Sequence, residues 1–271
     1  MKRSSILLFG VFSYAVFLAT FLYLVAFVGN LQRTALADWA PWLSELVPHS
    51  IDMGRATGPL ALAVAIDIGL VMIFGLQHSV MARIGFKRWL KRFLPASAER
   101  SVYVLLASSI LMLMFWQWRP IPGVVWSADS NLTAGLGWAV FAAGFGMVLV
   151  ATFLIDHFDL FGLKQVWAQF RDRTPTAPAF KTPLLYRLVR HPLYLGFLLA
   201  FWGGPAMSVG HFLFAAAMTG YILIAIGFEE RDLLHYLGRD YADYRKSVPM
   251  LLPGFKPLAG ARSTGDVQDS G

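Results

Sequence analysis

Titratable side chains gather at four places in this sequence, each next to a long apolar stretch. These places are Gln77-His78-Ser79, Asp156-His157-Phe158-Asp159, Arg190-His191 and Glu229-Glu230-Arg231-Asp232. Histidine beside a carboxylate can take up and release a proton near neutral pH, and paired carboxylates can hold a cationic ligand. Any one cluster also fits the simpler interpretation that polar residues settle at a membrane interface. Four such clusters together favour a functional site.

The elements that must position these groups are apolar. Of the 271 residues, 57% are hydrophobic and only 14% are charged, whereas soluble domains carry about 25% charged residues. Six segments are long enough to cross a bilayer as helices, at residues 6–28, 60–77, 102–118, 135–155, 192–209 and 212–228. The sequence therefore predicts an all-α, polytopic transmembrane bundle of about six helices.

The last two segments predict a tight helical hairpin, because only Gly210 and His211 separate them. Gly203-Gly204-Pro205 should break or kink the fifth segment. If that segment fails to span the membrane as a helix, five spanning helices remain. We expect a single membrane domain over residues 1–256, followed by a disordered cytoplasmic tail over residues 257–271.

The distribution of Lys and Arg predicts the orientation in the membrane. With the N-terminus in the cytoplasm, every Lys and Arg except Arg33, Arg55 and Arg119 falls on the cytoplasmic side. The net charge of +7 is then explained by membrane topology, so the expected partner is the lipid bilayer and no nucleic acid. Both termini and all four polar clusters are expected at the cytoplasmic face.

Several chemistries are excluded by what the sequence lacks. Without cysteine there is no disulfide, no thiolate metal ligand and no cysteine nucleophile. A helical His-x-x-x-His pair, a Walker A loop and a serine-hydrolase elbow are also missing from the sequence. We therefore expect no metal site.

Spaced motifs in the last third of the chain carry a resemblance to a known superfamily. They are Arg190-His191-Pro192-x-Tyr194-x-Gly196, Glu229-Glu230 and Gly238-x-x-Tyr241-x-x-Tyr244-x-x-x-Val248-Pro249. In this order they resemble the isoprenylcysteine carboxyl methyltransferase superfamily, which includes NnrU-like proteins and phospholipid methyltransferases. Upstream motifs, such as Gln77-His78-Ser79-Val80-Met81-Ala82-Arg83, are similar to the bacterial methanethiol S-methyltransferases, and this similarity covers about residues 1–253.

The resemblance implies S-adenosylmethionine as methyl donor, held by a cofactor-binding half at about residues 186–253. Carboxylates there would favour the positive groups of a sulfonium amino acid, and tyrosines would offer flat surfaces for adenine. Glycine at position 196 would let the donor approach the helix backbone. The cofactor-binding residues that the motifs imply are Arg190, His191, Tyr194, Leu195, Gly196, Glu229, Glu230, Tyr241, Tyr244 and Arg245.

The resemblance also implies a small thiol as acceptor, most directly methanethiol, which would become dimethyl sulfide by in-line methyl transfer. Because the thiolate is the nucleophile, a base is expected beside it. His157 and His78 are the candidate catalytic bases, with Asp156 or Asp159 to orient the imidazole. The residues expected to line the thiol pocket are Gln77, Phe153, Phe158, Asp159, Phe161, Phe201, Trp202 and Tyr221.

Two alternatives remain open from the sequence. The first is another acceptor, such as hydrogen sulfide, a prenylcysteine or a lipid; Ser247 stands where some members carry an arginine, which disfavours a carboxylate-bearing prenylcysteine. The second is a small membrane transporter or scaffold, which would need a polar path, whereas Asp67 is the only charged residue inside a span. The bacterial resemblance implies the inner membrane as location, and the oligomeric state is not predicted.

Overall fold

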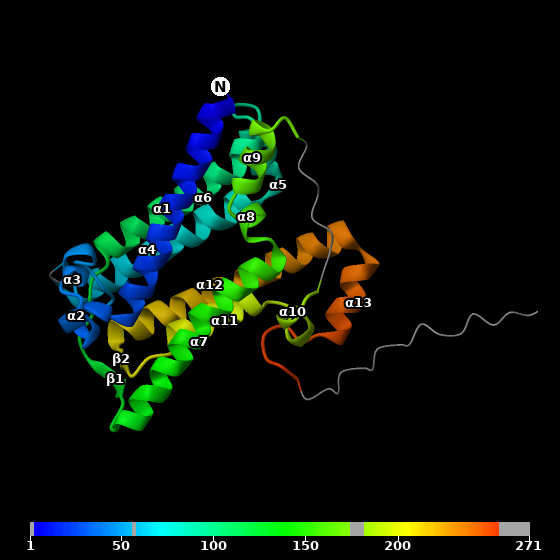
Figure 1. Cartoon of the computed structure of the whole chain (residues 1–271). Helices are drawn as coiled ribbons and strands as arrows, with labels where there is room; N and C mark the ends of the chain where they lie inside the picture. Colours follow the sequence, from blue (N-terminus) through cyan, green and yellow to red (C-terminus); the bar gives the residue numbers. More distant parts are fainter. Residues whose placement is uncertain (1–2, 56–57, 174–181, 255–271) are drawn as a thin grey trace, which may run out of the picture.

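The protein is a bundle of helices in a computed structural model that describes residues 3–55, 58–173 and 182–254 (Figure 1). The predicted tail at 257–271 lies outside the described residues. Five helices are long and apolar enough to cross a membrane: α1 (Arg3–Gly29), α4 (Leu60–Ala82), α6 (Glu99–Gln117), α7 (Asn131–Ile155) and α12 (Val209–Leu237). The prediction of an all-α polytopic bundle is therefore confirmed, with five long helices rather than six.

Short elements connect these helices. On one side of the bundle lie α2 (Leu36–Trp39), α3 (Trp42–Leu46) and the strands β1 (Val124–Ser127) and β2 (Ala206–Ser208), with the 3-10 turn η1 (Leu31–Arg33). On the other lie α5 (Ile84–Leu90), α8 (His157–Leu160), α9 (Leu163–Phe170), α10 (Leu185–Leu188) and α13 (Arg239–Ser247), with η2 (Ala96–Ala98). We call these the strand end and the polar end of the bundle.

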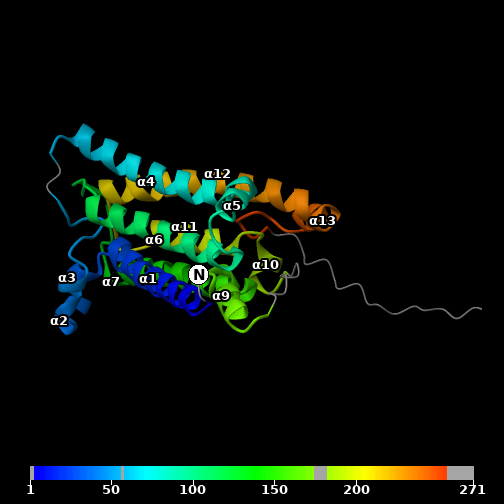
Figure 2. The same ribbon diagram turned by 90° about the horizontal axis from the view of Figure 1, so that it is seen from above.

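The helices are arranged in three layers, which Figure 2 shows from above. One outer layer holds α4 and α12, the middle layer holds α6 and α11 (Pro192–Trp202), and the other outer layer holds α1 and α7. Aromatic side chains fill the space between the layers, and Phe27, Trp118 and Phe214 lie almost completely buried where they meet. The layered order decides which polar residues can meet at the polar end.

The sixth crossing is made by a short helix and an extended segment. α11 has 11 residues, about 16 Å at 1.5 Å per residue, which is shorter than a bilayer core of about 30 Å. Gly203 is extended and ends α11, as the Gly-Gly-Pro motif predicts. β2 then pairs antiparallel with β1, which lies between α6 and α7. The chain therefore reaches the strand end before α12 begins.

The predicted position of the hairpin turn is wrong. Gly210 and His211 lie buried inside α12, and the turn instead spans residues 203–208. Ser208 explains the difference, because its hydroxyl caps α12 by accepting a hydrogen bond from the His211 N–H at 3.0 Å. The Gly-His pair is therefore the first turn of the helix.

The buried Asp67 has a structural role in α4. It is completely buried, and its Oδ1 accepts a hydrogen bond from the backbone N–H of Arg119 at 2.9 Å. Arg119 follows the end of α6, where N–H groups of the next segment need acceptors. The carboxylate therefore joins α4 to the segment that follows α6. This hydrogen bond gives the buried Asp67 a partner, so its presence inside the bundle does not require a transport path.

Close backbone packing fixes α11 against α7. A Cβ atom added to Gly144 of α7 would lie 2.7 Å from the Gly196 carbonyl oxygen of α11. The reverse is also true, since a Cβ at Gly196 would lie 2.7 Å from the Gly144 carbonyl oxygen. Glycines that allow such an approach are typical of interfaces between membrane helices.

We predict that Gly144→Leu destabilises the fold, because its side chain would collide with the α11 backbone. Overpacking of this kind costs about 1–3 kcal/mol, which should lower the melting temperature in detergent by roughly 2–10 °C. Gly146→Leu is the matched control, because a Cβ there meets no heavy atom within 4 Å. Tryptophan fluorescence during heating provides the measurement. Equal melting temperatures for the two variants would contradict the packing argument.

Candidate active site

The polar end contains a buried ion-pair cluster centred on Glu230. Glu230 Oε1 accepts from Arg190 Nε at 2.8 Å and lies 3.2 Å from His191 Nε2, while Oε2 lies 3.2 Å from Arg245 Nε. The Arg190 and Glu230 side chains are only 9% and 8% exposed. Several kcal/mol would be lost if one member of such a buried pair were left alone, so the cluster fixes the elements that carry it.

Local sequence explains why these side chains meet. His191 precedes α11 as its N-cap, and Pro192 occupies the first helical position, where the missing N–H costs nothing. Gly238, with φ of 56°, ends α12 and lets the chain turn into α13, which supplies Arg245. The backbone N–H of Arg190 then donates to the Pro249 carbonyl at 2.9 Å. The Val-Pro motif is therefore what returns the chain to the start of α11.

Glu229 is the less engaged of the two glutamates. Its side chain is 44% exposed, and its ion-pair partner is His191 Nδ1 at 3.9 Å. The Tyr194 phenol lies within hydrogen-bonding reach of the Glu229 carboxylate, which also interacts electrostatically with Tyr103 and Tyr221. A partly open carboxylate surrounded by phenols can bind a cation or a ligand hydroxyl group.

Further phenols near this site belong to α10 and α13. Burial, and then the Glu229 charge, raises the pKa of the Tyr186 phenol. Burial followed by the charges of Glu230 and Glu229 raises the pKa of Tyr241, and burial raises the pKa of Tyr244 to about 12. These phenols stay protonated at neutral pH, and the Tyr244 hydroxyl donates to the Tyr186 carbonyl at 2.6 Å.

His78 of α4 adjoins the same aromatic site. Its ring centroid lies 5.0 Å from that of Tyr103 and 6.5 Å from that of Tyr221. Its Nδ1 atom is buried and has no hydrogen-bond partner among the described residues. Gln77 beside it donates to the Met81 sulfur at 2.9 Å. The structure thus brings His78 close to the tyrosines that face Glu229.

His157 belongs to a separate cluster between α1 and α7. Its Nδ1 lies 2.9 Å from the Thr152 hydroxyl, and its Nε2 lies 2.8 Å from the Tyr14 hydroxyl. Thr152 donates its single hydrogen to the Leu149 carbonyl at 2.7 Å. Nδ1–H must therefore donate to Thr152, which leaves Nε2 to accept from Tyr14. Burial lowers the pKa of His157, in agreement with a neutral ring.

Asp156 and Asp159 do not orient His157 in this arrangement. Asp156 caps α8 by accepting from the Asp159 N–H at 3.1 Å, and it pairs with Lys164 at 2.5 Å. The Lys164 hydrogen bond lowers the pKa of Asp156. Asp159 Oδ1 accepts from Gln165 at 3.2 Å. The orienting groups for the His157 ring are instead Thr152 and Tyr14.

The residues expected to form one thiol pocket lie in three places. Phe153, Phe158 and Phe161 surround His157, and the Phe153 ring stacks on the imidazole at 4.3 Å. Tyr221 lies beside His78. Phe201 and Trp202 lie in the core, at the far end of α11. The His157 cluster lies where α1, α7 and α8 meet, whereas His78 lies on α4 and Glu229 on α12.

Two cofactor-binding candidates have packing contacts with other helices. Gly196 packs against the α7 backbone, so its missing side chain serves the helix contact described above. Leu195 packs against the core between the layers. The other predicted residues, which are Arg190, His191, Tyr194, Glu229, Glu230, Tyr241, Tyr244 and Arg245, lie together at the polar end.

Some residues of these clusters were not predicted. Tyr103 and Tyr186 adjoin Glu229, and Tyr14 and Thr152 hold His157. Tyr103 follows the start of α6 by one turn, so it lies at the same depth as the four polar clusters. The orientation predicted from Lys and Arg could have indicated that Tyr103 lies at this depth. A single tyrosine in an apolar helix, however, is usually part of a core.

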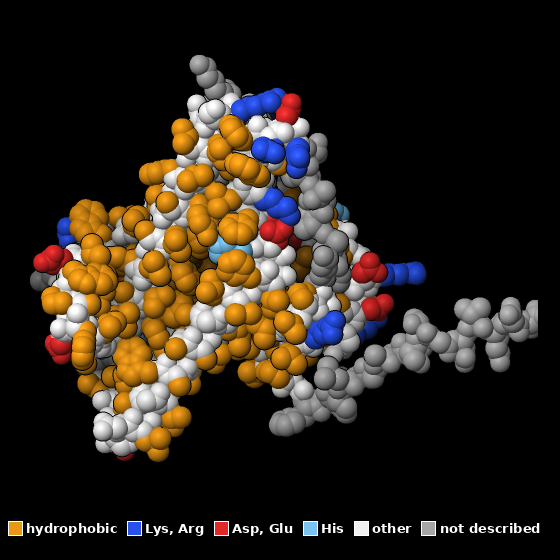
Figure 3. Space-filling view, viewed as in Figure 1, with side chains coloured by type: hydrophobic (Ala, Val, Ile, Leu, Met, Phe, Trp, Pro, Cys, Tyr) orange, Lys and Arg blue, Asp and Glu red, His pale blue; other side chains and the backbone are white. Residues whose placement is uncertain are grey.

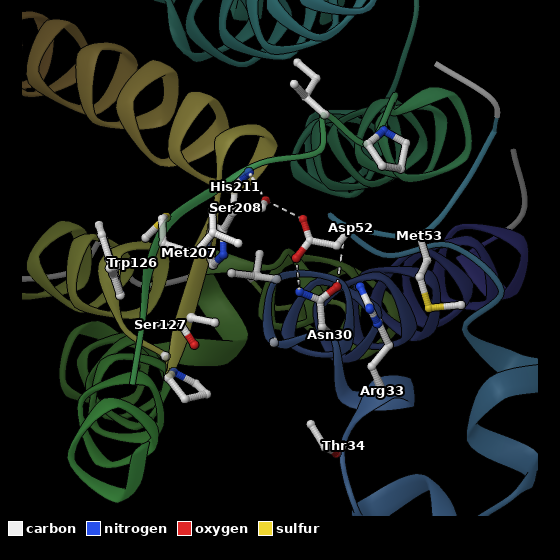
Figure 4. Close-up of a pocket in the computed structure, with 18 of the residues that line it drawn as sticks. Asn30, Arg33, Thr34, Asp52, Met53, Trp126, Ser127, Met207, Ser208 and His211 are labelled. Atoms are coloured by element: carbon white, nitrogen blue, oxygen red, sulfur yellow. Dashed lines mark hydrogen bonds between the residues drawn. The ribbon is translucent and has the colours of Figure 1, made fainter. Parts of the chain in front are cut away.

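A cavity with a volume of about 950 Å³ lies at the strand end (Figure 4). Asp52 reaches its rim, where Asn30 donates to Oδ2 at 2.7 Å and the Ser208 hydroxyl donates to Oδ1. Both carboxylate oxygens are therefore occupied in holding the ends of α1 and α12 together. The cavity contains none of the predicted site residues, so it is separate from the candidate active site.

We predict a pH-dependent stability term from His157. Its pKa in the folded protein is lowered below the ordinary value of about 6.5, so the unfolded chain binds more protons on acidification. The contribution of His157 to the free energy of unfolding is present above about pH 6.5. It is lost as the pH falls toward the pKa of His157 in the folded protein. Melting temperatures between pH 7.5 and 5.5 should therefore fall less in His157→Gln than in the parent. The exposed His235 provides the control variant, His235→Gln, and an unchanged slope in His157→Gln would contradict the prediction.

The chain is similar to several known proteins over most of its length. The chain is 51% identical over 251 residues to methanethiol S-methyltransferase 2 of Bradyrhizobium diazoefficiens, covering 93% of this chain and 91% of the relative. It is 48% identical over 253 residues to methanethiol S-methyltransferase of Mycobacterium tuberculosis, covering 93% and 98%. Nurim of Sus scrofa is 30% identical over 201 residues, or 71% and 72% of the two chains.

No protein-family model and no solved structure matches the chain. The similarity to the methyltransferases nevertheless extends over almost the whole membrane bundle, including both the His78 and the Glu229-Glu230 segments. By this identity and coverage, the chain belongs to the methanethiol S-methyltransferase family.

Proposed function

We propose that this protein transfers a methyl group from S-adenosylmethionine to methanethiol and releases dimethyl sulfide. The observation that carries the proposal is the partly open Glu229 carboxylate, with Tyr194 and His191 on one side and His78 beyond the tyrosines. The named relatives support a thiol S-methyltransferase, and their names supply methanethiol as acceptor. The donor follows from the methyltransferase class and the motifs of the site.

The residues at the polar end fit a methyl donor of this kind. When bound, S-adenosylmethionine supplies a methyl group on a positively charged sulfur. Glu230 is already satisfied by Arg190, His191 and Arg245, so Glu229 is the carboxylate left for a ligand cation or ribose hydroxyl. Tyr194 supplies a partly buried aromatic surface next to it. The Glu230 cluster keeps α11, α12 and α13 in place around that space.

The chemistry requires one bond to form and one to break. The acceptor sulfur forms a bond to the methyl carbon as the bond between that carbon and the donor sulfonium breaks, which leaves S-adenosylhomocysteine. The thiol proton must leave first, since the thiolate is the nucleophile. His78 is the base that we favour, because its Nδ1 has no hydrogen-bond partner among the described residues, whereas both nitrogens of His157 are engaged.

We place the polar end in the cytoplasm of a bacterial cell and the bundle in its inner membrane. Lys and Arg side chains gather mostly along one edge of the face in Figure 3, and hydrophobic side chains cover most of the rest. Basic loops stay on the cytoplasmic side during insertion. This orientation puts the N-terminus, the tail and the proposed site on the side where a soluble methyl donor is made.

We predict that Glu229→Gln weakens binding of S-adenosylhomocysteine by about tenfold, because the ligand ammonium loses a charged partner. Calorimetric titration of the purified protein in neutral detergent measures the affinity. Asp240→Asn, at an exposed acidic residue of α13, is the matched control. If the parent binds no S-adenosylhomocysteine, the proposed function is refuted; unchanged binding in Glu229→Gln refutes only the role of Glu229.

We predict that His78→Gln lowers kcat for methanethiol by about 10²–10⁴-fold, the typical contribution of a general base. The affinity for S-adenosylhomocysteine should change less than about threefold, since the base does not hold the donor. His157→Gln is measured in parallel, by gas chromatography of dimethyl sulfide at saturating donor. Loss of turnover in His157→Gln with full activity in His78→Gln would assign the base to His157.

A further inference from the structure

Three cations at the polar end have no role in the site described so far. Arg83 follows α4, Lys87 lies on α5 and Arg100 lies in the first turn of α6. We call them the cationic cluster. Arg83 is held in place, because NH1 pairs with Asp232 at 3.0 Å and the guanidinium lies 5.1 Å from the Phe228 ring centroid. It joins the end of α4 to the end of α12.

Lys87 and Arg100 are not held in this way. Both side chains are partly buried, and within the described part of the chain neither forms a hydrogen bond or an ion pair. Glu99, the acidic residue that precedes Arg100, pairs with Lys91 at 3.3 Å. Two half-buried cations without a partner are unusual, because burial disfavours the charged form of each.

The electrostatics of Lys87 support this view. Burial lowers its pKa first, and the charges of Arg100, Lys91 and Arg83 lower it further, while Glu99 opposes them. Like charges therefore crowd around a partly buried ammonium. An anionic group placed among them would remove the repulsion, so the cluster has the character of an anion site.

The cationic cluster adjoins the proposed site. Arg100 interacts electrostatically with His78 and Tyr103, and Arg83 interacts with Tyr103 and Tyr221. Arg83 contacts Phe228 and Asp232, which lie one residue before and three residues after Glu229 in α12, and Lys87 lies one helical turn after Arg83. Glu229 interacts electrostatically with the same two tyrosines. Glu229 and the cationic cluster therefore lie near the same two tyrosines. An α-amino acid carries an ammonium and a carboxylate on one carbon, which is the complementary pair of charges.

We propose that Lys87 and Arg100 bind the α-carboxylate of the methyl donor while Glu229 faces its α-ammonium group. The inference rests on the proposed function, since it concerns the amino-acid end of that donor. Arg83 is a positioning residue, because its contacts with Asp232 and Phe228 hold the end of α4 beside α12. The acceptor thiolate is a second anion with a similar charge, and the experiment must separate the two.

The test compares two ligands in neutral detergent with the full-length protein. S-adenosylhomocysteine carries both charges, and its decarboxylated analogue, S-adenosyl-3-thiopropylamine, keeps only the ammonium. The parent should bind S-adenosylhomocysteine about tenfold more tightly, the effect of one charge-assisted hydrogen bond. Arg100→Gln and Lys87→Gln should each bind it about tenfold more weakly and bind the analogue unchanged. Calorimetry gives both affinities without reference to turnover.

Arg88→Gln is the matched control, because Arg88 is an exposed cation on the same helix α5. Equal weakening of both ligands, or equal affinity of the parent for both, would refute the carboxylate subsite and leave the proposed function standing. Failure of the parent to bind either ligand would remove both proposals. An unchanged affinity in Arg100→Gln, with a higher apparent thiol pKa in the pH–rate profile, would assign the cluster to the acceptor and overturn the inference.

Discussion

The polar end of this protein depends on one buried carboxylate. Glu230 can be buried as an anion only because Arg190, His191 and Arg245 reach it from α11 and α13. Arg190 also donates to the carbonyls of Arg245 and Val248, which brings the end of α13 across the start of α11. A single charge therefore fixes the start of α11, the end of α12 and α13 relative to one another.

The same interaction explains why the adjacent residues Glu229 and Glu230 have different roles. Successive residues of a helix point about 100° apart, so Glu230 faces the ion pairs while Glu229 turns toward the tyrosines. One residue serves as the anchor and its neighbour stays available for a ligand. The Glu-Glu dipeptide thus joins stability and binding in a single turn of α12.

Much of the fold could be predicted from the sequence, because it depends on segment length and on the side of the membrane that basic residues prefer. Apolar runs fixed the long helices, and Gly203-Gly204-Pro205 marked the break after α11. The turn at Gly210 and His211 was placed wrongly, since a capping serine is a weaker signal than a glycine. Pairing of β1 with β2 had no local signal, because the strands lie far apart in the sequence.

For the site residues, the sequence predicted the depth in the membrane at which each one lies. It did not predict on which side of the bundle each one lies. Hydropathy and charge placed His78 and His157 at the same level, but the layers put α4 on one side and α7 on the other (Figure 2). Helix packing decides this rotation, and no periodicity in an apolar helix reveals it when lipid and protein faces are equally hydrophobic. For the same reason Gly196, a cofactor candidate by its motif, lies against α7.

The extended segment after α11 has a consequence for biogenesis. Backbone groups inside a bilayer need partners, and residues 203–210 find theirs in earlier parts of the chain. Gly204 donates to Gly137, Val209 to Gly123 and Gly210 to Ile121, while Pro205 accepts from Ala128. The last pair of segments therefore cannot settle in lipid as an autonomous unit during synthesis. These hydrogen bonds are complete only when α7 and the segment around β1 are in place.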